Sequence, residues 1–272
     1  MIDRIRTTQG TLRLRVAEPE LREPVKELIL RLSSEGNALG TELAVAGRRA
    51  WVKASPLRPR VGVRHALRHL VLGQHLPRER EFDNLRWLRE RLFEAVEPLA
   101  AGGLIHAGRP RFQVLVSALE EGASPFEEVF PGASRGERSD LLRELAGEIS
   151  RLHALHFVHR DLFPRNLLVR ERHAGRRLVL LDTWAGGPGP GLRGPAYDLA
   201  CWFLEPDLFT EEETRLFWGA YIQGLEAQGA RPQPDLAARV DRARRALIER
   251  LRREPGRLRG RAMPGAWTAP RG

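Results

Sequence analysis

The chain of 272 residues is short of cysteine, lysine and long apolar runs, and each shortage excludes something. Its one cysteine, Cys201, lies in the apolar run 199–203, so we expect a buried hydrophobic residue and no disulfide within the chain. No apolar run approaches the length of a membrane span, and residues 1–10 are polar and charged. These absences favour a cytoplasmic protein with a large core in one domain or two lobes.

Lysine is almost absent, since only Lys26 and Lys53 stand beside 43 arginines. The basic charge is also uneven. Residues 239–272 contain 11 arginines and three acidic residues, a net +8, whereas the whole chain carries +10. Residues 1–238 therefore carry only +2. We expect a nearly neutral body with a cationic C-terminal end, in which a well-placed lysine is conspicuous.

The segment HRDLFPRNLLV, residues 159–169, has the spacing of a phosphotransferase catalytic loop. His159 and Asp161 are followed by Asn166 at the H-R-D-L-x-x-x-N interval. A carboxylate at Asp161 would orient and deprotonate an attacking hydroxyl, and the neutral amide oxygen of Asn166 suits a magnesium ion. The alternative is an ordinary surface loop, which four correct positions disfavour.

The flanking pattern agrees with this interpretation. Apolar periodicity predicts a helix over 139–156, and short strands are expected at 167–169 and 178–181. The second strand ends on Asp182, where a second magnesium ligand is expected. No D-F-G follows, because the next residues are Thr183 and Trp184, but only the carboxylate is needed for metal binding.

Two strands are predicted at 41–46 and 50–54, joined by a Gly-Arg-Arg turn. Lys53 lies in the second strand, where a kinase needs a point charge for nucleotide phosphates. A helix is predicted over 79–96 to supply the glutamate that holds this lysine. Both Glu79 and Glu81 can reach, and either could instead be an acid that favours the helix dipole.

The nucleotide-binding loop is atypical, because Gly36 and Gly40 do not form a G-x-G-x-x-G pattern. Their backbone amides could still cover phosphates within the turn-rich stretch 33–40. A buried strand over 111–119 ends at Glu120, the expected hinge where adenine would bond to the backbone.

Two N-terminal segments are read from their periodicity. Residues 12–16 alternate and predict an edge strand, whereas residues 20–32 fit either a helix or a strand.

Beyond Asp182, residues 185–191 form a glycine- and proline-rich loop, and no A-P-E segment follows. Asp198 precedes an apolar helix and is expected either to cap it or to brace the catalytic loop, which His159 also supports. A last amphipathic helix over 235–253 has an arginine-rich outer face. That face is either simply solvated or attracted to acidic lipid.

These segments together resemble the lipopolysaccharide kinase family, which phosphorylates Kdo or heptose sugars of the lipid A-core. HRDLFPRNLLV resembles the catalytic loop of the family, and LVLLDTW resembles its metal-binding strand end. Residues 61–82 resemble an insertion seen in heptose kinases, and that alignment selects Glu81 over Glu79. The resemblance covers about residues 27–205.

The resemblance implies an α+β, bilobal protein-kinase-like fold. Its N-lobe, residues 1–118, would be small and β-rich with an insertion at 57–78. Its C-lobe, residues 119–254, would be compact and mostly helical, followed by a basic tail over 255–272. Lys53 with Glu81 would position ATP, Asp161 would be the base, and Asn166 with Asp182 would hold Mg²⁺.

The implied activity is ATP-dependent transfer of a phosphoryl group to a sugar hydroxyl of a lipopolysaccharide core or similar glycolipid. The alternatives are an aminoglycoside- or choline-kinase-like phosphotransferase and a pseudokinase that only binds. A protein kinase is disfavoured because A-P-E is absent. The basic C-terminal end suits the anionic inner-membrane surface, and no motif supports nucleic-acid binding.

Overall fold

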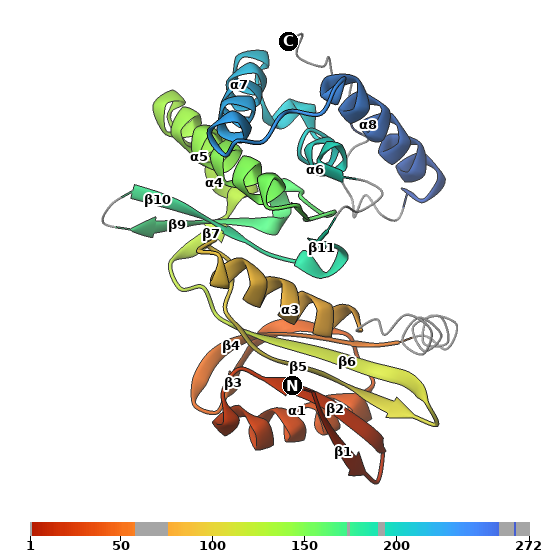
Figure 1. The fold of residues 1–272 in the computed structure, drawn as a ribbon. Coiled ribbons are helices and arrows are strands. Elements are labelled where there is room, and N and C mark those ends of the chain that lie inside the picture. Colours follow the sequence, from red (N-terminus) through yellow and green to blue (C-terminus); the bar gives the residue numbers. More distant parts are fainter. Residues whose placement is uncertain (1, 58–75, 173–174, 190–193, 256–263, 265–272) are drawn as a thin grey trace. The chain divides into compact units, whose positions relative to one another are not determined.

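The computed structural model describes residues 2–57, 76–172, 175–189, 194–255 and 264 (Figure 1). The chain divides into two compact units, Met1–Glu121 and Gly122–Gly272. Most of the insertion predicted at 57–78 and of the tail predicted at 255–272 lies outside the described residues.

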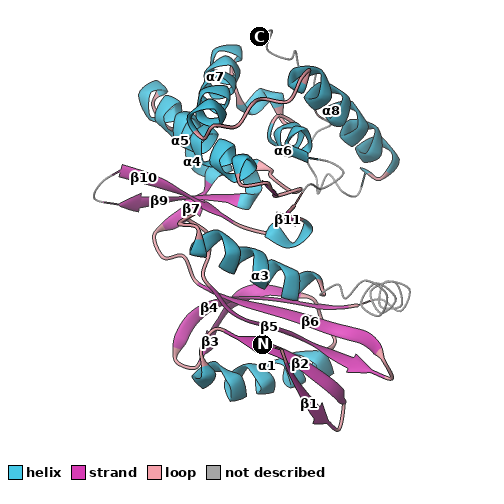
Figure 2. Cartoon of the chain, viewed as in Figure 1, coloured by secondary structure: helices cyan, strands magenta, loops and turns pink. Residues whose placement is uncertain are grey.

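The first unit is built on an antiparallel sheet of six strands in the order β1-β2-β5-β6-β4-β3 (Figure 2). The strands are β1 Asp3–Thr7, β2 Gly10–Val16, β3 Leu39–Val45, β4 Arg48–Pro56, β5 Pro98–His106 and β6 Arg109–Ala118. Tight turns join β1 to β2, β3 to β4 and β5 to β6, so each of these three pairs forms a hairpin.

Two helices, α1 Arg22–Glu35 and α3 Pro77–Glu90, cover opposite faces of this sheet (Figure 1). Gly102 and Gly103 of β5 show why they can approach closely. A Cβ on Gly102 would lie 2.9 Å from Ile29 of α1, and a Cβ on Gly103 would lie 2.9 Å from Leu76, the residue that precedes α3. Successive strand residues face opposite sides, so each glycine makes room for one helix.

The structure corrects three expectations for the N-terminal third. The ambiguous segment 20–32 is helical, and α1 runs on to Glu35, so the predicted loop 33–40 shrinks to residues 36–38. The strand expected at the edge, β2, is internal, because the unpredicted strand β1 forms the edge. The sequence reading also missed β5, whose two glycines and three alanines or prolines weaken the strand pattern.

The second unit combines helices with two small sheets. Its helices are α4 Phe126–Gly132, α5 Arg135–Ala154, α6 Gly194–Trp202, α7 Glu211–Ala227 and α8 Leu236–Arg253. Its strands are β7 Ala123–Pro125, β8 Phe157–Val158, β9 Leu167–Arg172, β10 Gly175–Leu180 and β11 Gly187–Pro188. The small sheets are β10-β9-β7 and β11-β8.

Aromatic side chains fill the core of the second unit. Trp202 is fully buried, and its ring centroid lies 4.7 Å from that of Phe209, 5.4 Å from Phe126 and 5.5 Å from Phe217. The helix α7 begins at a capping box in which the Thr210 hydroxyl accepts from Glu213 N, as its sequence predicted. Cys201 is buried in the same region, as expected.

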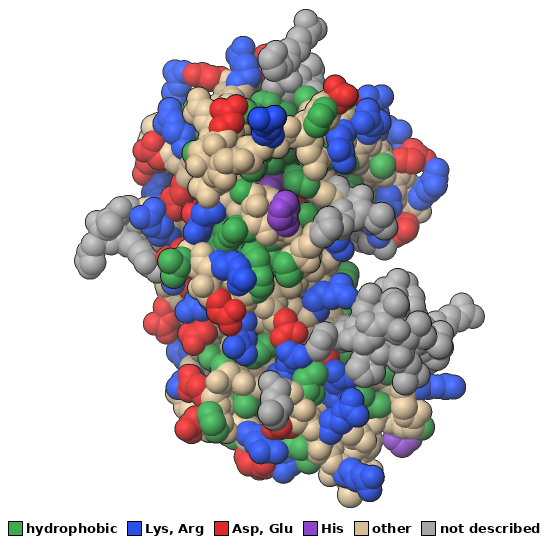
Figure 3. Space-filling model, in the orientation of Figure 1, with side chains coloured by type: hydrophobic (Ala, Val, Ile, Leu, Met, Phe, Trp, Pro, Cys, Tyr) green, Lys and Arg blue, Asp and Glu red, His purple; other side chains and the backbone are tan. Residues whose placement is uncertain are grey.

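The last helix, α8, packs an apolar face on α6 and leaves basic side chains outside (Figure 3). Leu236, Val240 and Leu247 are buried, as the periodicity predicted, but Arg244 is buried with them. Its guanidinium donates to the carbonyls of Phe203 and Leu204 at 2.8 and 3.3 Å, satisfying acceptors at the end of α6. None of the helices among the described residues has the length and apolarity to cross a membrane.

The start of α3 is anchored to the sheet by a buried ion pair. Arg13 of β2 and Glu79 of α3 are 3% and 0% exposed, and their side chains meet at 2.9 Å. Glu79 Oε2 also accepts from Leu76 N at 3.1 Å, which satisfies a backbone donor at the start of the helix. Arg15 and Asp83 form a second, more exposed pair one turn further along.

Replacing Glu79 should therefore destabilise the protein severely. We expect Glu79→Ala to lower the free energy of unfolding by about 3–5 kcal/mol, because the Arg13 charge would stay buried without its carboxylate. Glu90→Ala, on the same helix, is the control: it breaks only exposed pairs, with Arg86 and Arg91, each worth about 0–1 kcal/mol. Urea titration of both variants measures the difference, and equal losses would contradict the anchoring role.

Candidate active site

Lys53 lies on the face of the first sheet that α3 covers. Its strand neighbours Ala50, Val52 and Ala54 are buried in the core on the α1 face, so the period of two puts Lys53 on the opposite face. There its ammonium lies 3.0 Å from Oε1 of Glu81. Lys53 is 23% exposed and Glu81 only 1%, so the lysine remains accessible while the carboxylate is enclosed.

The two candidate glutamates of α3 do different work. Glu81 is shared by Lys53 and Arg78, whereas Glu79 is held by Arg13 and by the helix start. Residues two apart on a helix point about 200° apart, so they cannot share one partner easily. Of these two carboxylates, the helix geometry therefore gives Lys53 that of Glu81.

The positions of Gly36, Gly40 and Glu120, which the sequence predicted to contact the nucleotide, give little support to that role. Gly36 is the C-cap of α1, with φ of 71°, and its N–H bonds to the carbonyl of Leu32. Helix termination is enough to require glycine there. Gly40 lies inside β3, directly opposite Lys53 in the strand register. Glu120 lies in the short segment that follows β6.

In the second unit, the catalytic-loop motif follows β8 and is followed by a short 3-10 helix, Pro164–Asn166. The Asn166 amide nitrogen donates to the carbonyl of Asp161 at 2.7 Å, which closes the loop on itself. His159 is fully buried, and its Nε2 donates to the carbonyl of Leu181 at 2.8 Å. His159 therefore ties this loop to the residue that precedes Asp182.

Asp198 of α6 holds the backbone of the loop at its first two residues, His159 and Arg160. Its carboxylate is fully buried and accepts from the N–H groups of His159 and Arg160, each at 2.6 Å. Arg160 adopts a left-handed φ of 61°, a conformation that costs a residue with a Cβ about 1–3 kcal/mol. Two short charged hydrogen bonds offset that cost.

Gly186 fixes the other side of the loop. A Cβ at this position would lie 2.4 Å from the carbonyl oxygen of Val158 and 2.7 Å from that of His159. Both contacts are with backbone, which cannot swing away. Only glycine permits the segment after Asp182 to pack this closely on the start of the catalytic loop.

The environment of Asp161 favours a proton acceptor that is partly shielded from water. Burial raises the pKa of its carboxyl, and the charge of Asp182 raises it further, while Arg165, His159 and the Asn166 amide act in the opposite direction. Arg165 lies 3.6 Å from the carboxylate. A raised pKa makes the carboxylate a stronger base than one in water.

Asn166 and Asp182 fit a magnesium ion chemically. Because the Asn166 nitrogen is turned to the Asp161 carbonyl, its oxygen is the atom left for a ligand. Asp161 and Asp182 are close enough to raise the pKa of Asp161, and a dication would relieve that repulsion. Amide and carboxylate oxygens are the hard ligands that Mg²⁺ accepts, with water or phosphate completing the set.

Sequence reasoning missed several polar residues that support the site. Arg13 and Arg78 hold the two glutamates of α3, and His153 donates from Nε2 to Asp198 at 3.2 Å. His153 had a signal, since it continues the buried face of the predicted helix at four residues from Ile149. Arg13 had none, because an arginine that alternates with leucines in a strand normally faces water.

The profile of the Lipopolysaccharide kinase (Kdo/WaaP) family matches residues 62–184, a little under half of the chain. The resemblance to the lipopolysaccharide kinase family is confirmed. The matched stretch contains Glu81, Asp161, Asn166 and Asp182, and Lys53 lies just before it.

Solved structures show that the fold is protein-kinase-like. The structure of WaaP in complex with acyl carrier protein matches with a TM-score of 0.56 and 17% identity, over 90% of this chain and 99% of that one. A putative aminoglycoside phosphotransferase from Ralstonia eutropha JMP134 matches with a TM-score of 0.55 and 12% identity, over 96% of this chain and 85% of that one. The expected mixed α/β kinase-like fold is therefore correct.

Curated relatives match over a shorter stretch. The serine/threonine-protein kinase DCLK1 of Rattus norvegicus is 33% identical over 101 residues, which are 36% of this chain and 23% of that protein. The DCLK1 of Mus musculus is equally identical over 13% of its length. The match thus spans less than a quarter of these curated relatives.

The bracing role of Asp198 makes a direct prediction. In Asp198→Asn, an NH₂ group would face one of two backbone N–H donors and leave it unsatisfied, so we expect at least about 2 kcal/mol of lost stability. Asp140→Asn, which changes an exposed carboxylate paired with Arg143 at 3.3 Å, should change stability by less than about 1 kcal/mol. Denaturant unfolding compares the two, and equal stability would refute the brace.

Proposed function

We propose that the protein is an ATP-dependent kinase that transfers a phosphoryl group to a sugar hydroxyl, on a lipopolysaccharide core or a related glycolipid. The observation that carries the proposal is the braced loop bearing Asp161 and Asn166 beside Asp182, within the stretch that matches the family profile. We infer the substrate class from the likeness to the lipopolysaccharide kinase family, and the type of reaction from the geometry of this loop.

Each residue has a specific role in the proposal. Asp161 orients the acceptor hydroxyl and takes its proton. Lys53, held by Glu81, gives a point charge to the phosphates of ATP, and Asn166 with Asp182 would hold magnesium, which neutralises phosphate charge. The protein contributes mainly position and preorganised charge, because phosphoryl transfer needs little covalent chemistry from side chains.

The alternative phosphotransferase is one that acts on aminoglycosides or choline. The likeness to a putative aminoglycoside phosphotransferase supports the shared fold and no particular acceptor. A panel of acceptors separates the two proposals, since a cationic acceptor and an anionic glycolipid fragment differ in charge. Turnover with aminoglycosides alone would replace the glycolipid proposal.

Asp161→Asn tests the catalytic assignment. We expect turnover to fall by about 10²–10⁴-fold while the affinity for ATP is unchanged, because only the proton acceptor is lost. Turnover is measured as acceptor-dependent ADP release with lipopolysaccharide core fragments. Near-normal turnover would remove Asp161 from the mechanism.

Two further variants control this experiment. Asp182→Ala should weaken the binding of magnesium-ATP strongly, and Lys53→Met should weaken it through the phosphates, whereas Asp161→Asn should bind normally. Calorimetric titration of magnesium-ATP reports all three. A wild-type chain that binds nucleotide and turns over no acceptor would favour the pseudokinase alternative.

We further propose that the protein is cytoplasmic and that the outer face of α8 attracts it to anionic lipid. Five arginines of α8 are exposed: Arg242, Arg245, Arg250, Arg252 and Arg253. Three of them are paired within the helix, Arg245 with Asp241, and Arg252 and Arg253 with Glu249. Arg242 and Arg250 are therefore the better residues for a test.

Reversing the charge of Arg242 and Arg250 to Glu should weaken binding to anionic vesicles by an order of magnitude or more, since each basic residue near the surface contributes about 1 kcal/mol. The control reverses Arg135 and Arg143 on α5, which are also exposed to solvent. Cosedimentation at low and high salt measures the binding. Equal loss in both double variants, or no preference of the wild type for anionic vesicles, would end the membrane proposal.

A further inference from the structure

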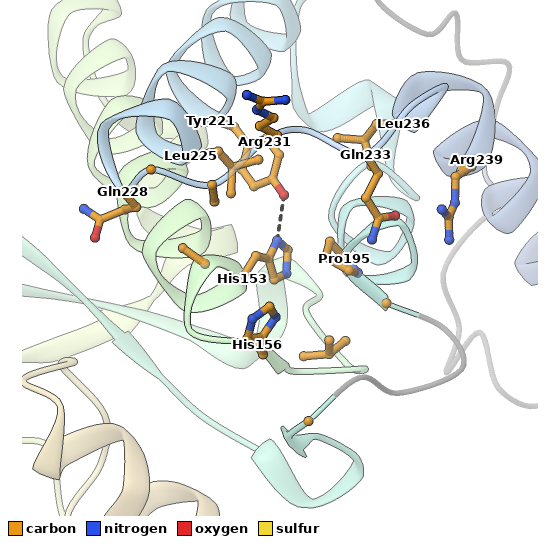
Figure 4. Close-up of a pocket in the computed structure, with 16 residues that line it drawn as sticks. His153, His156, Pro195, Tyr221, Leu225, Gln228, Arg231, Gln233, Leu236 and Arg239 are labelled. Atoms are coloured by element: carbon orange, nitrogen blue, oxygen red, sulfur yellow. Dashed lines mark hydrogen bonds between the residues drawn. The ribbon is translucent and has the colours of Figure 1, made fainter.

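The second unit contains a cavity of about 530 Å³ that the proposed chemistry does not use. The end of α5, the end of α7 and the start of α8 contribute to its wall (Figure 4). This volume is in the range of small-molecule sites. The cavity has room for a monosaccharide with one substituent.

The described residues that line the cavity include arginines and histidines and no acidic side chain. Arg239 lies in the wall and Arg231 is exposed, and neither forms an ion pair with any other described residue. The described lining therefore carries cationic and no anionic side chains, and the buried carboxylate of Asp198 lies 3.2 Å behind His153.

The lining also contains an uncharged polar side chain, that of Gln233, which could bind an uncharged part of a ligand. The Oε1 atom of Gln233 is buried and has no hydrogen-bond partner among the described residues. Figure 4 shows Gln233 and Arg239 on one side and His156 on another. Gln233 lines the cavity, and its amide can bond to a ligand hydroxyl once the side chain turns Oε1, which is closed to solvent, toward the cavity.

The polar groups of His153 and Tyr221, which form the floor of the cavity, already have hydrogen-bond partners within the protein. Tyr221 donates its hydroxyl to Nδ1 of His153 at 2.8 Å, because Nε2 of His153 donates to Asp198. Burial raises the pKa of Tyr221, and the charge of Asp198 raises it further, so the phenol remains a donor. Beyond this floor, the polar side chains that line the cavity are those of His156, Gln228, Arg231, Gln233 and Arg239.

We infer that this cavity is a binding site for a phosphorylated sugar, with the phosphate on Arg239 and a sugar hydroxyl on Gln233. A guanidinium binds phosphate oxygens in two parallel hydrogen bonds, which a neutral sugar cannot form. The inference goes beyond the proposed kinase activity, since binding here requires neither Lys53 nor the groups that would hold magnesium.

Calorimetric titration of the full chain, without ATP and at low salt, tests the site. Glucose 6-phosphate should bind, glucose should not, and inorganic phosphate should bind more weakly because it cannot reach Gln233. Arg239→Gln should weaken the binding of glucose 6-phosphate by about tenfold or more, as expected for a lost charge-assisted contact. Arg242→Gln, on the same helix and outside the cavity, should bind like the wild type.

Other outcomes overturn the inference. No binding of glucose 6-phosphate, or equal binding by Arg239→Gln and Arg242→Gln, removes the site. Inorganic phosphate that binds as tightly as glucose 6-phosphate reduces it to an anion contact. Lys53→Met should retain the binding, and a loss there would mean that the ligand binds at the nucleotide-contacting lysine. Thermal unfolding of each variant confirms that it is folded, and none of these results depends on turnover.

Discussion

The catalytic part of the structure depends on one buried negative charge, that of Asp198. Its carboxylate is fully enclosed and reaches water nowhere, so it must be satisfied by protein donors. Two of these are backbone N–H groups of the catalytic loop and one is His153. The loop N–H groups satisfy the Asp198 carboxylate, and the carboxylate in turn fixes the backbone of the loop. A change in either one would therefore leave the other without its partner. This mutual requirement keeps Arg160 in a left-handed conformation that its own preferences oppose.

The first unit uses the same device at the start of α3. Glu79 and Glu81 are both buried, and each is paired with cationic side chains. Glu79 pairs with Arg13 of β2, and Glu81 pairs with Lys53 of β4 and Arg78 of α3. Glu79 fixes where the helix begins, and Glu81 then meets Lys53 as a consequence of helix geometry. Through the pair of Arg13 and Glu79, the hairpin of β1 and β2 thus takes part in positioning Lys53.

The candidate catalytic loop could be picked out from sequence because phosphotransferase chemistry requires fixed residue types at fixed intervals, and its catalytic role stays a prediction. The helix α7 was equally predictable from its capping box. Partners far apart in the chain were not, since nothing near Arg13 indicates a glutamate 66 residues later. The segment 20–32 was ambiguous because its apolar residues fit two periods, and tertiary packing of α1 on the sheet decides between them. The strand β5 was missed because small residues that admit two helices carry little strand signal.

The absence of a G-x-G-x-x-G pattern has a structural counterpart in the described part of the first unit. The strand β3, which pairs with β4, is preceded by the helix α1, and Gly36 ends that helix. A glycine loop that covers phosphates normally joins two strands, so its backbone amides can approach the nucleotide. Only residues 36–38 separate α1 from β3, which leaves little chain for such a loop. In the kinase that we propose, phosphate binding would therefore rest more heavily on Lys53, which Glu81 holds from an almost fully buried position.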